Sequence, residues 1–355
     1  WNNRNVHSGE DLQCWFSRTV DLFLYDAIFS LNYISELSKI CNEHKIKYIA
    51  WTYEPLCEAI NVKETIDNKC NHIFSFDRKE VQQKQNAGID TVRHLPMGIH
   101  LGRLKKTRIS KEDRLKYSAD ISFVGDLYEK ETESLTQNMN DAATGYIEAL
   151  IDMQSILYGC YFLEELMNEK VFYKILCEEI KSLDEDEMEV KRVELINRMA
   201  YMATRKERLI LINLLGKYHD MRCYCSESRG ILDDTDRRYI SDYMNEFPKI
   251  AVCSKINLSP TTRNIQTAIP VQSLEIMGGG GGFLLSNYQE ELVENYVDGE
   301  EVVVYESYVD AMEKATYYLK HKETREQIRK NGYIKTCASF NMDTQIKTIL
   351  KNVEL

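Results

Sequence analysis

The chain has 355 residues, of which 43% are hydrophobic, and its formal net charge is −11. A chain of this length and apolar content can bury two cores of ordinary size, so we expect two domains. The acidic balance argues against a nucleic-acid partner, because binding to a phosphate backbone relies on clustered Lys and Arg.

Neither membrane nor secretion signals are visible in the sequence. No apolar run approaches the ~20 residues that would span a bilayer, and no charged-then-apolar segment opens the chain. The ten cysteines lack the spacing of a disulfide framework, and this lack is typical of proteins in a reducing compartment. We therefore expect a soluble, cytoplasmic protein with no transmembrane segment. The chain opens at Trp1 without a Met, so we expect its native start, and part of its first domain, to lie upstream.

Two further features could suggest a metal, but both have simpler explanations. The close pair Cys223 and Cys225 has no second pair or His cluster to complete a zinc site, so we expect buried strand residues. The acidic run 184–187 predicts a solvated loop or helix end, because metal-binding carboxylates converge in space rather than in sequence. The prediction is that the protein has no metal site.

Between residues 20 and 100, short β-rich runs alternate with helical stretches, which is typical of βα units on a parallel sheet. Strands are predicted at 21–25, 46–51, 73–76 and 91–95, and helices at 34–43 and 77–86. Asp77 is expected to cap the second helix, and Gly88 to end it in a left-handed conformation. The charged stretch 102–118 holds little that could be core, so we place the linker there and assign the N-terminal domain to 1–104.

A strand at 120–125 opens the second domain, assigned to 105–340, and a helical segment at 129–200 is inserted into it. The βα pattern then resumes, with strands predicted at 221–225, 255–258, 282–285 and 301–305 and helices at 206–215, 239–247, 271–277, 308–319 and 324–331. The last stretch, 341–355, predicts a helix at 342–353 that packs back toward the N-terminal domain, with Ile346, Ile349 and Leu350 buried.

Five consecutive glycines at 278–282 lead into an apolar strand. Such a run lets the backbone approach a bulky ligand and presents unshielded N–H groups, and we expect it at the carboxyl edge of a parallel sheet. A flexible helix-to-strand loop is the alternative. The run is neither a Walker loop, since no Gly-Lys-Ser/Thr follows, nor a dinucleotide fingerprint, since a strand follows where a helix should.

Several segments resemble one known family. KINLS (255–259), AIPVQSLEIM (268–277), GGFLLSNYQE (281–290) and KNGY (330–333) are similar to the glycosyltransferase C-terminal domain of the CgeB-like (spore maturation protein CgeB) family. The segment 121–128 is similar to the first strand and Gly turn of that domain, and looser N-terminal matches at 48–55, 73–77 and 94–96 extend the resemblance over roughly residues 20–335. The resemblance implies an α/β protein of GT-B fold, with two Rossmann-like domains and a nucleotide sugar bound in the central cleft, mostly against the second domain.

The resemblance also implies a donor site. Glu275 would accept hydrogen bonds from the ribose hydroxyls, a role suited to a two-oxygen acceptor; an exposed helical Glu is the alternative. Gly125 and Asp126 would lie beside the diphosphate. The remaining implied contacts are glycines that would pass close to the nucleotide: Gly278, Gly279 and Gly280.

The sequence departs from the family at two positions of this donor site. Gln272 stands where the family usually has Arg, and Ala268 where it has Gly. A neutral amide replaces a cation suited to a diphosphate, although nearby Arg263 could compensate. These departures keep open a second interpretation, a catalytically impaired transferase-like protein that binds nucleotide sugars.

Two candidates for catalysis lie in the N-terminal half, which binds acceptors in GT-B enzymes. Glu54 follows a strand and could deprotonate an acceptor hydroxyl if the transferase inverts; a cap of the following helix is the alternative. His94 lies at the end of another strand, where a structural histidine is the alternative.

The leading functional hypothesis is a metal-independent glycosyltransferase with no cofactor. It would transfer a hexose or N-acetylhexosamine from a nucleotide diphosphate sugar, expected to be UDP-linked, to a glycan, protein or cell-envelope acceptor. A GT-B epimerase or phosphorylase is disfavoured, because no Lys lies in a setting suited to a pyridoxal Schiff base.

Overall fold

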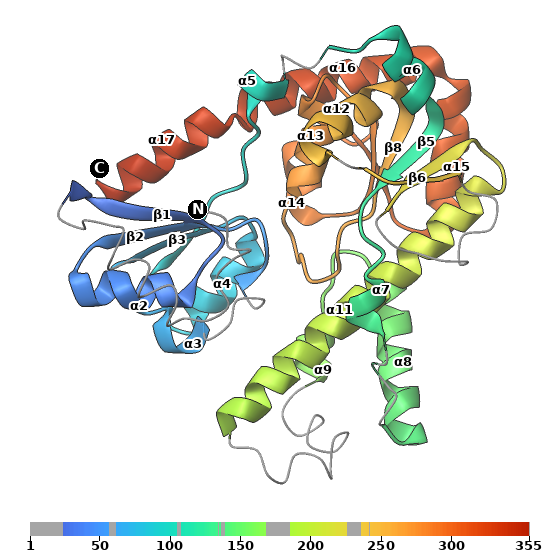
Figure 1. Ribbon diagram of the computed structural model, residues 1–355. Helices are drawn as coiled ribbons and strands as arrows, with labels where there is room; N and C mark the ends of the chain where they lie inside the picture. The colour runs from blue at the N-terminus through green and yellow to red at the C-terminus, as the bar shows by residue number, and fades with distance from the viewer. Residues whose placement is uncertain are drawn as a thin grey trace. The chain divides into compact units, whose positions relative to one another are not determined.

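The computed structural model describes residues 24–56, 62–104, 108–133, 135, 139–167, 185–225, 236–240 and 242–354. Their contacts divide the chain into two compact units, each with its own parallel sheet (Figure 1). One unit comprises Trp1–Met97 and Asp343–Leu355, and the other comprises Gly98–Met342. The division after Met97 lies before the charged stretch in which the sequence places the linker.

The first unit contains a four-stranded parallel sheet in the order β1-β2-β3-β4. Its elements are β1 (Ala27–Leu31), α2 (Ser35–His44), β2 (Lys47–Trp51), α3 (Val62–Thr65), β3 (Asn71–Ser75), α4 (Arg78–Asn86), β4 (Val92–His94) and α17 (Met342–Val353). The inner strands β2 and β3 are almost wholly buried, as expected for parallel strands covered on both faces.

Local sequence signals fix the ends of α4. The Asp77 carboxylate accepts hydrogen bonds from the backbone N–H groups of Lys79 and Glu80, and Gly88 has φ 85°, so both predictions at this helix are confirmed. The first strand was predicted at 21–25, and its two described residues, Leu24 and Tyr25, are not in a strand. Residues 21–23 lie outside the described residues, and Leu24 is 73% exposed. The strand that pairs with β2 is β1, further along the chain.

The C-terminal helix α17 spans the predicted residues and is counted almost entirely with the first unit. Ile349 is buried, and Lys47 of β2 donates to the carbonyl of Val353 at 2.7 Å. Ile346 and Leu350 are 38% and 40% exposed, so the prediction that all three apolar residues are buried is wrong for these two. The helix buries a narrower stripe than its apolar pattern suggests.

The second unit contains a six-stranded parallel sheet in the order β10-β9-β8-β5-β6-β7. Its elements are α5 (Leu101–Leu104), α6 (Lys111–Tyr117), β5 (Ala119–Val124), α7 (Glu129–Thr132), α8 (Asp141–Ile156), α9 (Leu163–Leu166), α11 (Glu185–Gly216), β6 (Met221–Tyr224), β7 (Asp236–Arg238), α12 (Tyr243–Cys253), β8 (Ser254–Ser259), α13 (Val271–Gly278), β9 (Leu284–Asn287), α14 (Glu290–Asn295), β10 (Val303–Tyr305), α15 (Tyr308–Lys320) and α16 (Lys322–Ser339). The chain builds outward from β5 to β7 on one side, and from β8 to β10 on the other. The strand order therefore reverses between β5 and β8, and in open parallel sheets ligands bind at the carboxyl ends of the strands at such a switch point.

Helices cover both faces of this sheet. Leu211 and Leu215 of α11 share one buried cluster with Ala311 and Ala315 of α15 and with the strands. Helices α12 and α13 contact β8, and α12 also contacts β5. Both faces are thus closed, which explains why the central strands β5, β8 and β9 are almost continuously buried.

The charged stretch assigned to a linker forms α6 in its described part. Ser110 and Asp113 make a reciprocal capping box at its start, and Asp113 also pairs with Lys249 of α12 at 2.9 Å. Helix α6 packs against α12, so this segment is part of the second unit. The sequence pattern failed here because a short helix can be held by capping and ion pairs without an apolar stripe.

The helical segment predicted at 129–200 lies between β5 and β6, and its described part is mostly α8 and the start of α11. These two helices pack against each other, and their contact buries a separate apolar cluster. Its members include Ile147 and Ile151 of α8 with Ile196 and Met199 of α11. Because α11 is 32 residues long, residues 195–203 pack on α8 while residues 211–215 pack on the sheet.

Candidate functional site

The switch point is formed by the ends of β5 and β8. Gln272, in the first turn of α13, donates from Nε2 to the carbonyl of Val124, the last residue of β5, at 2.9 Å. The next residue, Gly125, donates its N–H to the carbonyl of Tyr224 at 3.1 Å. The sheet thus uses the Gly125 N–H that a diphosphate would need. A Cβ at Gly125 would lie 2.9 Å from the ring of Phe123, so close packing also accounts for this glycine.

A cation that the sequence did not single out joins the two strand ends. Arg208 of α11 donates to the carbonyls of Asp126 at 2.6 Å and Pro260 at 2.9 Å, and its guanidinium lies over the rings of Phe123 and Tyr128. The Asp126 carboxylate itself accepts from the N–H of Tyr128 at 2.7 Å. The only indication of Arg208 in the sequence was its position directly before the apolar run that begins at residue 209.

Glu275 lies one turn further along α13 in a polar cluster. Its Oε1 is 2.6 Å from Nη2 of Arg103, in α5, and its Oε2 accepts from the hydroxyl of Tyr243, in α12, at 3.1 Å. Arg103 also donates to the carbonyl of Met244 at 2.9 Å. Burial raises the pKa of Glu275, whereas Arg103 and the Tyr243 hydroxyl oppose that shift. The prediction of Glu275 as a polar acceptor is compatible with this geometry, but its two partners could not be found from sequence spacing.

The glycine run lies at the other edge of the sheet. Gly278 is the last residue of α13, and a Cβ added to it would lie 2.0 Å from Cδ1 of Ile99. Gly279 is the C-cap residue of the helix. Gly280 has φ 118° and packs against Val252, at the end of α12. Loops that follow a helix and precede a parallel strand lie at the amino edge. The expected position of these glycines at the carboxyl edge is therefore wrong, and they are packing and turn residues away from the switch point.

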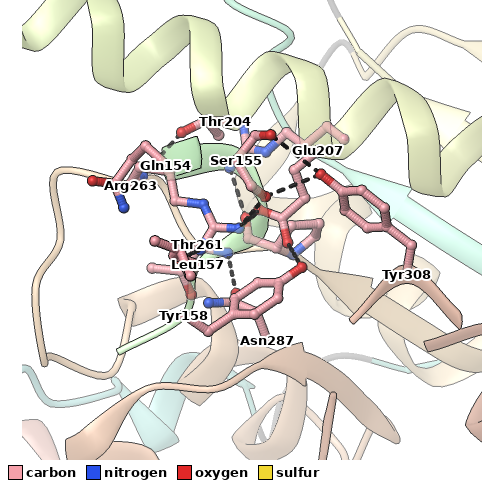
Figure 2. A network of polar contacts seen from close by, with 12 residues as sticks. Gln154, Ser155, Leu157, Tyr158, Thr204, Glu207, Thr261, Arg263, Asn287 and Tyr308 are labelled. Carbon is pink, nitrogen blue, oxygen red and sulfur yellow. Dashed lines mark hydrogen bonds and ion pairs between the residues drawn. The ribbon is translucent and has the colours of Figure 1, made fainter. Parts of the chain in front are cut away.

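Arg263 is held in a buried network beside the switch point (Figure 2). Its Nη2 is 2.8 Å from Oε2 of Glu207, and the two side chains are 5% and 0% exposed. The hydroxyls of Tyr158 and Tyr305 donate to Oε1 of Glu207 at 3.0 and 2.9 Å. Burial raises the pKa of Glu207 and the Arg263 charge opposes the shift.

The same network connects the inserted helices to the loop after β8. Arg263 donates to the carbonyls of Ser155 at 2.8 Å and Leu157 at 3.1 Å, at the end of α8, and its own N–H donates to Thr204 of α11. A guanidinium committed to a buried carboxylate and two carbonyls does not fit the expected role of compensating cation at a diphosphate. Arg208 lies closer to that role, because it bridges the two strand ends.

The two catalytic candidates of the first unit lie in separate surroundings. Glu54, which is exposed, accepts from Nδ2 of Asn32 at 2.6 Å, and Asn32 in turn accepts from the N–H groups of Tyr53 and Glu54. Nε2 of His94, at the end of β4, lies 3.3 Å from the carbonyl of Phe76. The alternative role of Glu54 as a helix cap concerns 57–61, outside the described residues.

A buried carboxylate of the first unit was missed by the sequence analysis. Glu80 of α4 accepts from the hydroxyl of Ser75 and from the N–H of Leu56, both at 2.6 Å, so it ties the end of β3 to the loop after β2. Burial raises its pKa to about 7. The sequence signal for Glu80 was its place in the first turn of a helix that follows a strand. Acidic residues at that place commonly do no more than stabilise the helix start, so this signal did not distinguish Glu80.

No group of three or more His, Cys, Asp or Glu in the described part of the chain could hold a metal ion. None of the helices within the described ranges is long and apolar enough to cross a membrane. Cys223 is buried in β6, and its Sγ is 3.6 Å from that of Cys225 just after the strand.

Comparisons with known proteins agree with this architecture. Residues 205–351 match the sequence model of a family described as glycosyl transferase-like, a stretch that includes β8 and α13. A search of curated proteins found no match. The narrower resemblance to the CgeB-like family stays a prediction.

Solved structures share the fold at low sequence identity. Anabaena HepE in complex with UDP-glucose is similar with a TM-score of 0.53 and 10% identity, over 97% of this chain and 81% of that one. Sucrose-phosphate synthase from Thermosynechococcus elongatus is similar with a TM-score of 0.52 and 8% identity, over 98% and 76%. A glycosyltransferase from Rickettsia africae is similar with a TM-score of 0.51 and 11% identity, over 100% and 82%. The chain is thus an α/β protein with parallel-sheet Rossmann-like domains and a GT-B fold, and its C-terminal part is glycosyl transferase-like in sequence.

Proposed function

We propose that this chain is a glycosyltransferase that transfers a hexose or N-acetylhexosamine from a UDP-linked donor to a glycan, protein or cell-envelope acceptor. The observation that carries the proposal is Glu275. It is a largely buried carboxylate on the helix that starts at the β5/β8 switch point, within the glycosyl transferase-like stretch.

The chemistry of the switch point suits a nucleotide. An ionised carboxylate offers about four lone-pair sites, and Arg103 and Tyr243 use two of those on Glu275. The other two would accept the adjacent ribose hydroxyls. Arg208 supplies positive charge at the strand ends, so the neutral Gln272 does not leave the site without a cation. A UDP-linked donor is favoured because the similar Anabaena structure holds UDP-glucose.

We assign acceptor activation to the first unit, with Glu54 and His94 as candidates. We further propose that transfer needs no metal and takes place in the cytoplasm. The cytoplasmic proposal is supported by the ten cysteines of the sequence, which lack the spacing of a disulfide framework. Transfer that persists in the presence of a chelator would support the metal-free proposal, and loss of transfer on chelation would contradict it.

The donor site is tested by calorimetry with UDP, UDP-glucose and UDP-N-acetylglucosamine on the wild type, Glu275→Ala and Glu313→Ala. Loss of hydrogen bonds to a charged acceptor should weaken binding by about 1.5 to 3 kcal/mol in Glu275→Ala. Glu313, an exposed residue of α15, is the matched control, whose replacement should leave the affinity unchanged. A wild type that binds none of these nucleotides, or a Glu275→Ala variant of unchanged affinity, would place the donor site elsewhere.

Turnover separates the transferase from the impaired alternative. Release of UDP from the bound sugar nucleotide is measured with panels of glycan and peptide acceptors. Release that depends on an acceptor supports a transferase. Tight donor binding without release in any panel would favour the protein that only binds nucleotide sugars.

A further inference from the structure

Arg103 comes from a distant segment and contacts the carboxylate that the proposed function assigns to the ribose. It belongs to α5, directly after the division between the two units, and is 172 residues from Glu275 in the sequence. The Nη2–Oε1 distance of 2.6 Å is that of a charge-assisted hydrogen bond. Nothing in the local sequence of α13 supplies this cation.

The guanidinium also binds α12, so it joins two helices. Its Nη1 donates to the carbonyl of Met244, in the first turn of α12, at 2.9 Å. The neighbouring residue, Tyr243, donates to the other oxygen of Glu275 and stacks on Phe247, with ring centroids 4.7 Å apart. The carboxylate is therefore held at both oxygens, one by α5 and one by α12.

The charge state of Glu275 depends on this arrangement. Its side chain is 13% exposed, and burial disfavours the ionised form. Among the residues that the structure describes, the titratable groups that face it are Arg103 from α5 and Tyr243 from α12, while Gln272 on its own helix is neutral. Of these groups, Arg103 alone brings a positive charge. An ionised carboxylate has only acceptor sites, whereas a protonated carboxyl loses one of them to its proton, so the ionised form is the better acceptor for two ribose hydroxyls.

We propose that Arg103 is a positioning residue of the nucleotide site, which holds Glu275 ionised and oriented as the acceptor for the ribose hydroxyls. This inference rests on the proposed function. It differs from a direct contact of Arg103 with the diphosphate, because it requires the ribose and not the phosphates.

The test compares uridine, which has the ribose but no phosphate, with UDP. Affinities are measured between pH 5 and pH 8.5 by ligand-observed NMR for uridine and by calorimetry for UDP. The proteins are the wild type, Arg103→Ala, Arg103→Lys and Arg329→Ala. Arg329 pairs with Glu326 on α16 and its carbonyl lies near the glycine run, so its replacement removes one cation at the opposite edge of the sheet.

Affinity for both ligands should fall as the pH falls through the pKa of Glu275. In Arg103→Ala the midpoint of that fall should rise by about one to three pH units, because the opposite charge that lowers the pKa is gone. Arg103→Lys should return the midpoint toward the wild type, since it restores the charge, and Arg329→Ala should not move it. In a protein that already carries Glu275→Gln, Arg103→Ala should have no further effect on the affinity for uridine. Melting temperatures confirm that each variant is folded.

Different failures have different meanings. A wild type that binds nucleotides, with unshifted midpoints in Arg103→Ala or no recovery in Arg103→Lys, would overturn the inference and leave the proposed function standing. A weaker affinity for UDP with an unchanged affinity for uridine would show that Arg103 acts on the phosphates, and would also overturn the inference. A wild type that binds neither ligand at any pH would overturn both the inference and the proposed function.

Discussion

Removing one charge from the buried pair of Glu207 and Arg263 should strongly destabilise the second unit. Glu207→Gln keeps the size of the side chain and one oxygen for the two tyrosine hydroxyls, but leaves the Arg263 guanidinium, 5% exposed, without its counter-ion. Breaking a buried ion pair by removing one partner costs about 3 to 5 kcal/mol. We expect the free energy of unfolding of this unit to fall by that amount.

The assay can follow the two units separately. The three tryptophans of the sequence, Trp1, Trp15 and Trp51, all belong to the first unit, and Trp51 is buried in β2, so tryptophan fluorescence reports this unit during urea unfolding. Circular dichroism at 222 nm reports the helices, most of which belong to the second unit. Glu207→Gln should move the dichroism transition to lower urea and leave the tryptophan transition close to that of the wild type.

The control lies on the same helix. Lys206 pairs with Asp152, but both side chains are well exposed, so Lys206→Gln should cost less than about 1 kcal/mol. A second comparison combines Glu207→Gln with Arg263→Met. Because neither charge is then left without its partner, the free energy of unfolding should fall less in the double variant than the two single variants would predict by addition. A loss below about 1 kcal/mol in Glu207→Gln, or strictly additive losses, would refute this account of the pair.

Two further predictions concern single positions. The pKa of Glu80 is raised to about 7, so its carboxyl favours folding when protonated, and the first unit should lose about 3 kcal/mol as the pH rises from about 4.5 to above 7. Glu80→Gln should flatten that dependence in urea titrations followed by tryptophan fluorescence, and an equally steep loss in the variant would contradict the assignment. A Cβ at Gly332 would lie 2.3 Å from the backbone oxygen of Glu301, so Gly332→Ala should destabilise by about 1 to 3 kcal/mol. Gly145→Ala, in an open position of α8, should instead stabilise by about 0.5 to 1 kcal/mol, and equal effects of the two alanines would contradict the packing argument.

The sequence by itself determined the elements whose signals are local. The βα alternation predicted parallel sheets in both halves, Asp77 marked the start of α4, and the apolar spacing predicted the full extent of α17. Caps, periodicity and strand-forming runs act over a few residues, so they can be read along the chain. The resemblance in the stretch around α13 added the fold family, which the similar solved structures confirm.

The tertiary structure alone decided which residues share a site. The sequence placed the glycine run beside the ligand and made Arg263 a candidate cation for the diphosphate, whereas the fold puts the glycines at the amino edge and pairs Arg263 with Glu207. Arg103 and Arg208 reach the switch point from segments far from α13. A charged side chain is recognisable in a sequence, but its partner is set by strand order and helix direction, because these decide which distant residues meet at one edge of a sheet.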